Sequence, residues 1–428
     1  MKLEALLPRR SGTGPWNDEA LLTVDEARKR IQRLARPVSG VERVPLRGAL
    51  GRVLAEDVIA GMDVPPHDNA GMDGYALSGV DLADDGSAAL TVVGTGLAGH
   101  AFGGIVPAGC CVRVMTGAVM PAGCDTVVPQ ESCRIQVGAI HIPAGALRRG
   151  DNRRRRGEDL QAGKPALDAG KLLRPADLGL IASLGLPEVV VRRKLRVAFL
   201  SSGDELCTFE QPRDAGSVYD SNRYALWGAL ERLGCDGLDL GVVRDEPAAL
   251  QAALRLGCET ADAVITTGGV GEGAADHLRN ALAALGQVAF WRIAMRPGRP
   301  MAFGRIASGP HEAVLFGLPG NPVAALAAFY HIAREGLLGM MGARTKPLPL
   351  LRVTALCAMR KVPGRIEYQR AVLEPTKDGR LGARLTGNQG SGVLRSMSLA
   401  DGFVVLGHDQ AAVRAGEPVD FLAFEGLV

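Results

Sequence analysis

The sequence predicts a multidomain protein with a central doubly wound parallel-sheet α/β domain, a β-rich second domain and a small C-terminal all-β domain. Three observations support this fold class. The chain has 428 residues, which is too long for one hydrophobic core. Apolar β-rich runs alternate with helical patterns between residues 195 and 342. Short strands separated by glycine and proline fill residues 61–163 and 343–428 instead.

These changes of pattern give the expected domain boundaries. Residues 1–20 form an N-terminal tail, and 21–60 together with 164–194 form a helical linker domain, domain I. The β-rich domain II covers 61–163, and the α/β domain III covers 195–342. Domain IV, the C-terminal β domain, covers 343–428.

Composition excludes several classes of protein. The chain is 47% hydrophobic and 22% charged with a net charge of +3, which is typical of a folded soluble protein and argues against a broad nucleic-acid-binding surface, with a local basic patch left open. No run approaches the roughly 20 apolar residues of a membrane helix, and the first twenty residues lack a signal-peptide core. The eight cysteines show neither zinc spacing nor a disulfide framework, so we expect a cytoplasmic protein.

The first predicted elements belong to domains I and II. Thr23 and Glu26 have capping-box spacing at the start of a helix that ends before Pro37. A second helix is expected within 172–186, and strands are expected at 41–46, 90–93, 111–115, 126–128 and 189–191. Residues 148–156, RRGDNRRRR, are the densest charge run, for which a solvated loop and an anion-binding surface are both open interpretations.

Domain III is predicted to alternate strands and helices. The expected strands are 195–200, 238–243, 262–267, 288–293 and 313–317. The expected helices are 221–233, 247–256, 275–285 and 322–334. This order predicts a parallel sheet covered by helices on both faces, and right-handed crossovers then place ligands at the carboxyl ends of the strands.

A glycine-rich turn after strand 262–267 is the main candidate for an anion site. A helix follows it and is expected to stop at a left-handed Gly286. Unpaired N–H groups and the positive end of a helix dipole suit a phosphate, although tight packing without a ligand is the alternative interpretation. The turn matches neither the phosphate-loop nor the dinucleotide fingerprint. Its glycines and the basic residues that follow are Gly268, Gly269, Gly271, Gly273, Arg292, Arg296 and Arg299.

Acidic residues follow three successive strands of the predicted sheet. Glu205, Asp245 and Asp276 would therefore lie at one edge, beside the oxyanion site. Mg²⁺ prefers one or two carboxylates together with substrate phosphates, so these residues are candidate Mg²⁺ ligands, with helix caps or surface charges as the alternative. After the last strand, Asn321 is expected to cap the final helix and Pro322 to occupy its first turn.

Eight short motifs occur in order along nearly the whole chain. They are GMDGYA at 71–76, MTGA at 115–118, RGED at 156–159, SGDEL at 202–206, DSN at 220–222, GGV at 268–270, PGRP at 297–300 and GLPGNP at 317–322. Together they resemble the molybdopterin molybdenumtransferases, the MoeA family, which also supplies the C-terminal half of gephyrin. Each motif alone is weakly specific, whereas the full series is highly specific.

The resemblance implies a four-domain, elongated homodimer whose active site lies between the α/β domain of one subunit and parts of the other. The implied reaction inserts molybdate into adenylylated molybdopterin with Mg²⁺ and releases AMP. An adenylylating enzyme and recipient molybdoenzymes are implied partners. The implied catalytic residues are Asp73, Thr116, Asp159, Glu205, Asp245 and Asp276, and further substrate-binding residues are Arg154, Pro319, Asn321, Pro322, Arg370 and Ser391.

Several residues depart from the family pattern. Gly271 stands where a serine is usual, and arginine stands at 292, 296 and 299 where lysines are expected. Arginine keeps the charge but is a planar fork and not a compact ammonium, so phosphate geometry need not be preserved. His277 and Asp401 also differ. A non-catalytic dimer that binds or delivers molybdopterin cofactor is therefore an alternative, and a nucleotide pyrophosphatase on the same α/β domain is a second one.

Overall fold

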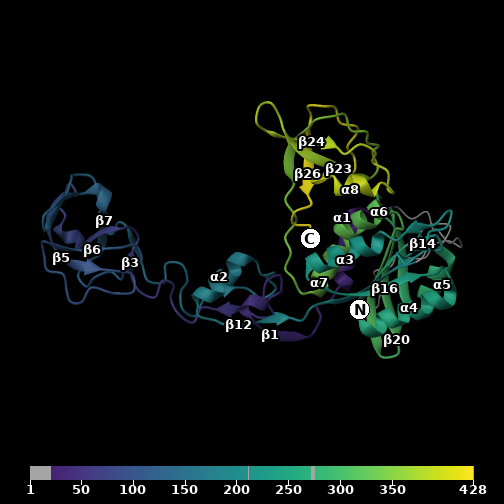
Figure 1. Cartoon of the computed structure of the whole chain (residues 1–428), viewed down its shortest axis with the longest axis horizontal. Helices are drawn as coiled ribbons and strands as arrows, with labels where there is room; N and C mark the ends of the chain where they lie inside the picture. Colours follow the sequence, from purple (N-terminus) through teal and green to yellow (C-terminus); the bar gives the residue numbers. More distant parts are fainter. Residues whose placement is uncertain (1–20, 211, 271–274, 428) are drawn as a thin grey trace.

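The computed structural model describes residues 21–210, 212–270 and 275–427, and the chain is elongated (Figure 1). A β-rich module lies at one end, and the α/β domain and a C-terminal barrel lie at the other. Between them, β1 (Val41–Pro45) pairs antiparallel with β12 (Glu188–Arg192). We call residues 41–192 the arm, and residues 21–38 together with 195–342 the body.

The far end of the arm is a six-stranded sheet with the order β7-β4-β6-β5-β9-β8. One face buries Val112, Val114 and Val127, and the other buries Leu77, Ile140 and Ile142, so both faces carry a core. The strands are β4 (Gly74–Leu77), β5 (Ala88–Gly96), β6 (Cys110–Val114), β7 (Thr126–Pro129), β8 (Arg134–Gln136) and β9 (Ala139–Ile142).

The near end of the arm has its own small core around Leu54, Ile181 and Val191. It contains α2 (Pro175–Ser183) and a strand pair of β2 (Val58–Ile59) and β11 (Pro165–Leu167). A further pair, β3 (Asn69–Ala70) and β10 (Arg153–Arg154), leads into the outer module.

Helix α1 (Val24–Leu34) begins at the predicted capping box, since the Thr23 and Glu26 side chains each accept a hydrogen bond from the other residue's backbone N–H. Its buried face, which includes Ala27 and Ile31, packs into the core of the body and not against the linker strands. Arg28 Nε donates to the carbonyl oxygen of His331 at 2.7 Å, which fixes the helix there.

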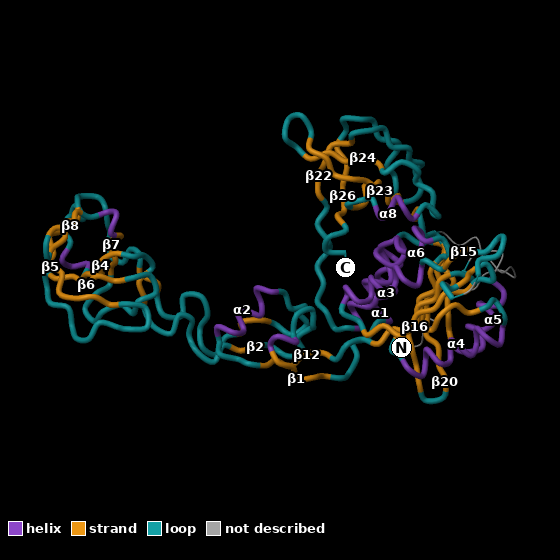
Figure 2. Tube along the Cα trace, in the orientation of Figure 1, coloured by secondary structure: helices purple, strands orange, loops and turns teal. Residues whose placement is uncertain are grey.

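The body is a mixed sheet with the order β16-β13-β17-β21-β20-β18, in which the first four strands are parallel. Helices cover both faces (Figure 2), which confirms the predicted doubly wound class. Its strands are β13 (Arg196–Ser202), β16 (Asp236–Val243), β17 (Ala263–Thr267), β18 (Gly286–Arg292), β20 (Pro300–Ser308) and β21 (His311–Leu318). Its helices are α3 (Asn222–Leu233), α4 (Pro247–Thr260), α5 (Ala275–Leu285), α6 (Pro322–Ala328) and α7 (Arg334–Met340), with a π-helical turn at Phe329–Ala333.

Two predictions for this sheet are wrong. The sheet is not all parallel, because β20, a strand that the sequence pattern did not predict, lies between β21 and β18 and pairs antiparallel with both. Gly286 does not end α5 in a left-handed conformation but begins β18. A Cβ there would lie 2.1 Å from the carbonyl oxygen of Arg305, and one at Gly304 would lie 2.2 Å from that of Gln287. Both glycines therefore allow the two strands to approach.

The C-terminal domain is a small closed barrel. Strand β25 pairs with both β26 and β23, which closes the order β23-β24-β22-β26-β25. The predicted all-β character holds except for one short helix, α8 (Leu394–Ser398). The barrel strands are β22 (Leu351–Ala355), β23 (Ile366–Pro375), β24 (Leu381–Leu385), β25 (Gly402–Leu406) and β26 (Pro418–Ala423).

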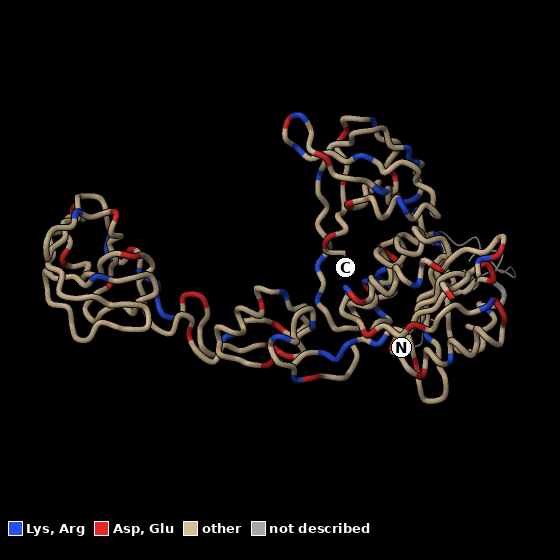
Figure 3. The backbone as a smooth tube through the Cα atoms, in the orientation of Figure 1, with Lys and Arg blue, Asp and Glu red and all other residues tan. Residues whose placement is uncertain are grey.

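The barrel docks on the body at two places. Strand β19 (Met295–Arg296) of the body pairs with β23, and the His331 ring stacks on Tyr368 with centroids 3.5 Å apart. Among the described residues, no helix combines the length and apolar character that a membrane span requires. Acidic and basic residues are mixed along the whole molecule (Figure 3).

Candidate functional site

Three loops meet at the carboxyl edge of the parallel strands, as predicted. They follow β13, β17 and β21, and we call this region the edge site. A Cβ on Gly268 would lie 2.2 Å from the carbonyl oxygen of Ser202, and one on Gly320 would lie 3.5 Å from the Cα of Gly268. Such close packing requires glycine at 268, where φ is +90°.

The glycine turn is only partly available to an anion. The N–H of Gly268 donates to the carbonyl oxygen of Leu318 at 3.2 Å, so the expectation that this group is unpaired is wrong. Gly269 has φ of +67° and packs on α5, where a Cβ would lie 3.0 Å from Leu278 Cδ2. Gly271 and Gly273 lie outside the described residues, and so does the side chain of Asp276.

A buried polar cluster lies beneath this turn. Ser201 Oγ donates to Asp220 Oδ1 at 3.0 Å and lies 2.9 Å from Thr267 Oγ1. The neighbouring Ser202 Oγ and Thr266 Oγ1 are buried without a hydrogen-bond partner within the described ranges. Buried hydroxyls usually have hydrogen-bond partners, so each of these two hydroxyls still has a hydrogen bond to offer.

Helix α3 fastens the loop that follows β21. Asn222 Nδ2 donates to the carbonyl oxygen of Gly320 at 2.7 Å. Pro319 is buried behind this loop, and Pro322 occupies the first turn of α6 as predicted. Asn321 stands at the N-cap position, but its side chain makes no capping hydrogen bond, so the predicted cap is wrong. Its exposed amide therefore faces solvent at the edge site.

Two of the three predicted metal ligands lie on adjacent loops of this edge. The backbone N–H of Asp245 donates to Asp204 Oδ1 at 3.1 Å, which joins the loop after β16 to the loop after β13. The Glu205 carboxylate folds back over Gly203, where a Cβ would lie 2.6 Å from Glu205 Oε2. Asp245 Oδ1 is buried and has no hydrogen-bond partner in the part of the chain that the structure describes.

The unpartnered oxygen of Asp245 is suited to a divalent cation. An unpartnered buried carboxylate oxygen is costly, and a cation would satisfy it. Within the described part of the chain, no three His, Cys, Asp or Glu side chains come together in an arrangement that could hold a metal ion. The predicted third ligand, Asp276, belongs to α5 at the same edge, so its role stays a prediction.

The basic residues reach the same edge from the other side. Strand β18 runs in the direction of β21, so Arg292 at its end lies at the carboxyl edge. Gly298 packs the following loop on the first turn of α6, since a Cβ there would lie 3.1 Å from the carbonyl oxygen of Ala324. Arg299 is exposed, and Arg296 is 55% exposed with its Nη1 4.0 Å from Glu367 Oε1. The edge site therefore carries exposed cations.

The barrel approaches the edge site through Arg370 and Ser391. Arg370 is only 1% exposed, and its guanidinium donates to Ser396 Oγ and to the carbonyl oxygens of Asn388 and Gly390. Burial, and then the positive charge of Arg296, lower the pKa of Arg370 to about 10. The carbonyl oxygen of Ser391 accepts the N–H of Val323 in α6 at 3.0 Å. Arg370 thus holds the loop that docks on α6.

The remaining predicted residues lie in the arm. Asp73 Oδ1 accepts both the backbone N–H and the hydroxyl of Thr116, each at 2.7 Å. These bonds, the backbone one first, hold the pKa of Asp73 below its ordinary value. Arg154 is exposed beside them, with its Cγ 3.8 Å from where a Cβ of Gly71 would lie. Asp159 lies further toward the linker, where its N–H donates to Val64.

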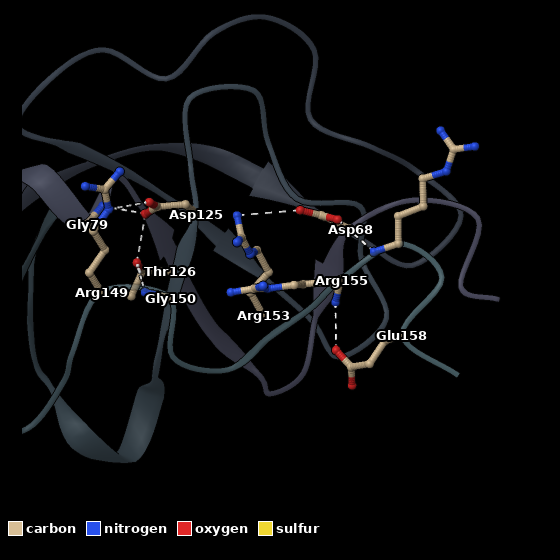
Figure 4. A network of polar contacts seen from close by, with 10 residues as sticks. Asp68, Gly79, Asp125, Thr126, Arg149, Gly150, Arg153, Arg155 and Glu158 are labelled. Carbon is tan, nitrogen blue, oxygen red and sulfur yellow. Dashed lines mark hydrogen bonds and ion pairs between the residues drawn. The ribbon is translucent and has the colours of Figure 1, made fainter. Parts of the chain in front are cut away.

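Three of the six arginines in the basic run of the arm form ion pairs with carboxylates. Arg149 pairs with Asp125 at 2.8 Å, and Arg153 pairs with Asp68 at 3.6 Å (Figure 4). Arg156 pairs with Asp63 at 2.6 Å. Arg148, Arg154 and Arg155 are exposed and have no acidic partner among the residues described, so these three members of the run remain available to an anion.

One chain does not bring the two groups of residues together. Asp73, Thr116, Arg154 and Asp159 lie in the arm, and the linker strands separate them from the edge site in the body (Figures 1 and 2). A site that uses both groups would need a second copy of the chain.

Comparison with known proteins assigns the family. Residues 22–185 match the family model described as the MoeA N-terminal region (domain I and II), and 352–424 match the MoeA C-terminal region (domain IV). Residues 198–338 match the model described as "Probable molybdopterin binding domain". The molybdopterin molybdenumtransferase of Haemophilus influenzae is 37% identical over 95% of this chain and 100% of its own length. The chain belongs to the MoeA family.

Other relatives cover similar shares. Molybdopterin molybdenumtransferase 2 of Mycobacterium tuberculosis is 33% identical over 90% of this chain and 95% of its own length. The crystal structure of the molybdopterin biosynthesis MoeA protein from Pyrococcus horikoshii has a TM-score of 0.77 at 27% identity, covering 94% of this chain and 100% of that one. This MoeA-family chain is therefore an enzyme of the transferase class.

Sequence reasoning missed the buried polar cluster of this MoeA-family member. Asp220 and Asn222 stood in a motif used only for the resemblance, yet they bond Ser201 and Gly320 directly. The available signal was a pair of hydroxyl residues at the end of each of two apolar strands, 201–202 and 266–267. Buried strands rarely end in two hydroxyls unless these bond each other or a ligand.

Proposed function

We propose that this protein inserts molybdate into adenylylated molybdopterin, with Mg²⁺, and releases AMP. The observation that supports the proposal is the edge site, where the buried polar cluster, the joined loops of Glu205 and Asp245, and exposed arginines lie at the carboxyl ends of parallel strands. Relatives whose sequences match nearly the whole chain are named molybdopterin molybdenumtransferase. Substrate phosphates and molybdate are both oxyanions, so one positively charged edge suits both.

Glu205 and Asp245 would hold Mg²⁺, because their loops are joined and Asp245 Oδ1 lacks a protein partner among the described residues. Bound Mg²⁺ supplies charge neutralisation at a phosphoanhydride. Asp276 would orient the metal or the pterin from the start of α5. The side chains of the protein position the site. Asn222 fixes the loop after β21, and Ser201 is held in the buried polar cluster by its hydrogen bond to Asp220.

Arg296, Arg299 and the N–H group of Gly269 would bind the phosphates. Oriented cations and N–H groups stabilise the charge that develops as the phosphoanhydride bond breaks. Arg296 is suited to this role because it is exposed and its nearest acidic partner, Glu367, is at the 4.0 Å limit of an ion pair. Arg370 would act indirectly. It is buried, and its guanidinium holds the loop at 388–390 in place through hydrogen bonds.

The active enzyme would be a homodimer in the cytoplasm. The separation of Asp73, Thr116, Arg154 and Asp159 from the edge site supports a site completed by the arm of a second copy. The eight cysteines are free thiols, which suits a reducing compartment. An adenylylating enzyme would supply the substrate and molybdoenzymes would receive the product.

AMP release from adenylylated molybdopterin, with molybdate present or absent, tests the activity. Molybdate-dependent release is expected, and its absence in the wild-type protein would refute the proposed function. The Glu205→Gln variant is expected to lose release while keeping pterin binding. If Glu205→Gln and Asp276→Asn both leave function unchanged while pterin still binds, the non-catalytic delivery dimer is the better description. Cleavage of simple dinucleotides without pterin would indicate a pyrophosphatase instead.

Mixing two inactive variants tests the composite site. Asp73→Asn inactivates the arm group and Glu205→Gln inactivates the edge site. A mixed dimer then contains one intact site only if the arm of one copy serves the body of the other. Because half of the dimers are mixed and each has one of two sites intact, about a quarter of wild-type activity is expected. No recovery in dimers shown to exchange subunits would mean that the site is not shared.

A further inference from the structure

Exposed aromatic side chains gather at one place beside the edge site. Among the described residues, the exposed large aromatic side chains are Phe209, Tyr219, Tyr224 and Trp227, although aromatic residues make up only 4% of the chain. Phe209 and Tyr219 lie in and after the strand pair β14 (Leu206–Cys207) and β15 (Val218–Tyr219), which begins directly after Glu205. Tyr224 and Trp227 lie on α3. We call Phe209, Tyr219 and Tyr224 the aromatic surface.

The rings of the aromatic surface are held in place. Phe209 stacks on Tyr224 with centroids 5.0 Å apart and an interplanar angle of 27°, and Tyr219 tilts against Phe209 at 5.7 Å. The Arg223 guanidinium lies 5.3 Å from the Tyr224 ring centroid. Tyr224 therefore contacts both a ring and a cation. Phe209 is 63% exposed even though Tyr224 covers one of its faces, so its opposite face is open to solvent.

A chain of polar contacts connects the aromatic surface to the glycine turn. Arg223 pairs with Asp220 at 3.3 Å and with Asp239 at 3.1 Å, and its side chain is only 13% exposed. Asp220 accepts from Ser201, which in turn contacts Thr267, the residue before Gly268. The Asp220 carboxylate therefore contacts both Ser201, in the buried polar cluster of the edge site, and Arg223, the cation beside the stacked rings.

We propose that the open face of Phe209 is a stacking site for the adenine base of an adenylylated substrate. This proposal rests on the proposed function and adds a subsite to it. A phosphoanhydride gripped at the carboxylates and arginines of the edge site has a flat base at its adenylyl end. A fixed aromatic ring in the segment that follows Glu205 offers that base a partner. Tyr219 borders Phe209 and limits how far the base can slide.

A small molecule suits this surface better than a protein. A specific protein interface uses roughly 20–30 residues on each side, whereas the aromatic surface is three rings flanked by charged side chains. Base–aromatic stacking needs only one open ring face and tolerates solvent at its rim. The supporting cation Arg223 is neutralised by Asp220 and Asp239, so it would not compete with the edge site for phosphate.

AMP itself is the probe, because its binding needs neither pterin nor turnover. Phe209→Leu keeps an apolar side chain but removes the stacking face, and the AMP dissociation constant is expected to rise about 5- to 150-fold. Phe209→Trp is expected to restore tight binding. Trp227→Leu is the matched control, since it removes an exposed aromatic ring from the same helix as Tyr224, and AMP affinity should not change. Molybdopterin affinity should be the same in all three variants.

A fluorescent base gives a second readout. 2-Aminopurine riboside monophosphate loses fluorescence when its base stacks, so quenching is expected with the wild type and Phe209→Trp and not with Phe209→Leu. AMP affinity that is unchanged in Phe209→Leu, or no AMP binding by the wild type at millimolar ligand, overturns the proposal. A change of oligomeric mass with unchanged AMP affinity would also overturn it and identify the aromatic surface as a protein contact.

These outcomes separate the subsite from the proposed function. Phe209-dependent AMP binding in a wild-type protein that shows no molybdate-dependent AMP release would leave the subsite standing and remove the proposed function. Molybdate-dependent AMP release together with an AMP affinity that does not depend on Phe209 would support the proposed function and refute the stacking subsite.

Discussion

Replacing Arg193 by methionine is expected to loosen the arm from the body. Arg193 follows β12 in the linker, and its two Nη atoms donate to the Asp262 carboxylate at 2.7 and 2.6 Å. Asp262 lies directly before β17 and also accepts the backbone N–H of Arg196 at 2.9 Å. The Arg193 side chain runs over Gly40, where a Cβ would lie 2.6 Å from its Cδ. The pair therefore bridges both crossings between arm and body.

The free energy lost in Arg193→Met can be estimated from the geometry of the Arg193–Asp262 pair and from the solvent exposure of its side chains. Hydrogen bonds to a charged partner contribute about 1.5–3 kcal/mol when buried. The Arg193 and Asp262 side chains are 32% and 21% exposed, so solvent screening reduces this contribution. We expect a loss of about 1–2 kcal/mol, equivalent to about a 5- to 30-fold shift of the local opening equilibrium.

Amide hydrogen exchange measures this opening directly. The Arg193 N–H donates to the carbonyl oxygen of Gly40 and the Arg196 N–H donates to Asp262, so both amides should exchange about 5- to 30-fold faster in Arg193→Met. Amides within β17 should not change. Arg43→Met is the control, since Arg43 pairs with Glu188 at side-chain exposures of 63% and 46%, and exposed pairs contribute little. Unchanged exchange at Arg196, or equal acceleration throughout β17, would refute the reasoning.

Three further predictions concern buried groups. Burial, and then Arg28 and Arg334, hold the pKa of His331 well below 6.5; the unfolded chain therefore takes up a proton that the fold excludes, and stability should fall as pH drops below about 6.5. His331→Phe should remove this dependence of Tm on pH, and a persistent dependence would contradict it. Arg370→Met strands three acceptors and should lower barrel stability by about 3 kcal/mol in calorimetry, whereas the exposed Arg380→Met should not. Burial raises the pKa of Cys111 to about 12, so iodoacetamide should modify this thiol only after unfolding, and labelling of the native protein would count against this.

The parts of the fold that could be predicted are those set by local pattern. The capping box at Thr23, the strand at 262–267 and the helix at 275–285 each rest on residues close in sequence, and the structure contains all three. Strand β20 could not be predicted, because Pro300 and Gly304 hide its pattern and only its pairing with β18 explains them. The packing of α1 on the body likewise depends on partners far along the chain.

In the candidate site, too, some features follow from the local sequence pattern and others depend on contacts between distant residues. Strand order placed the carboxylates, glycines and arginines at one edge, because parallel strands end together. Which groups remain available could not be predicted, since the N–H of Gly268 is taken by Leu318 and Arg370 is buried against its own loop. Asp220 was overlooked because its importance depends on contacts with Ser201 and Arg223 and not on its spacing.

The arm is an insertion into the body, and this has a consequence for synthesis on the ribosome. Helix α1 is made early, yet Arg28 bonds a residue 303 positions later, and Ile31 lies in a core with Phe316 and Leu337. The whole arm is synthesised and has time to fold before the residues that cover the apolar face of α1 are made. A nascent chain halted shortly before residue 316 should therefore expose that helix to chaperones, although its arm is already native.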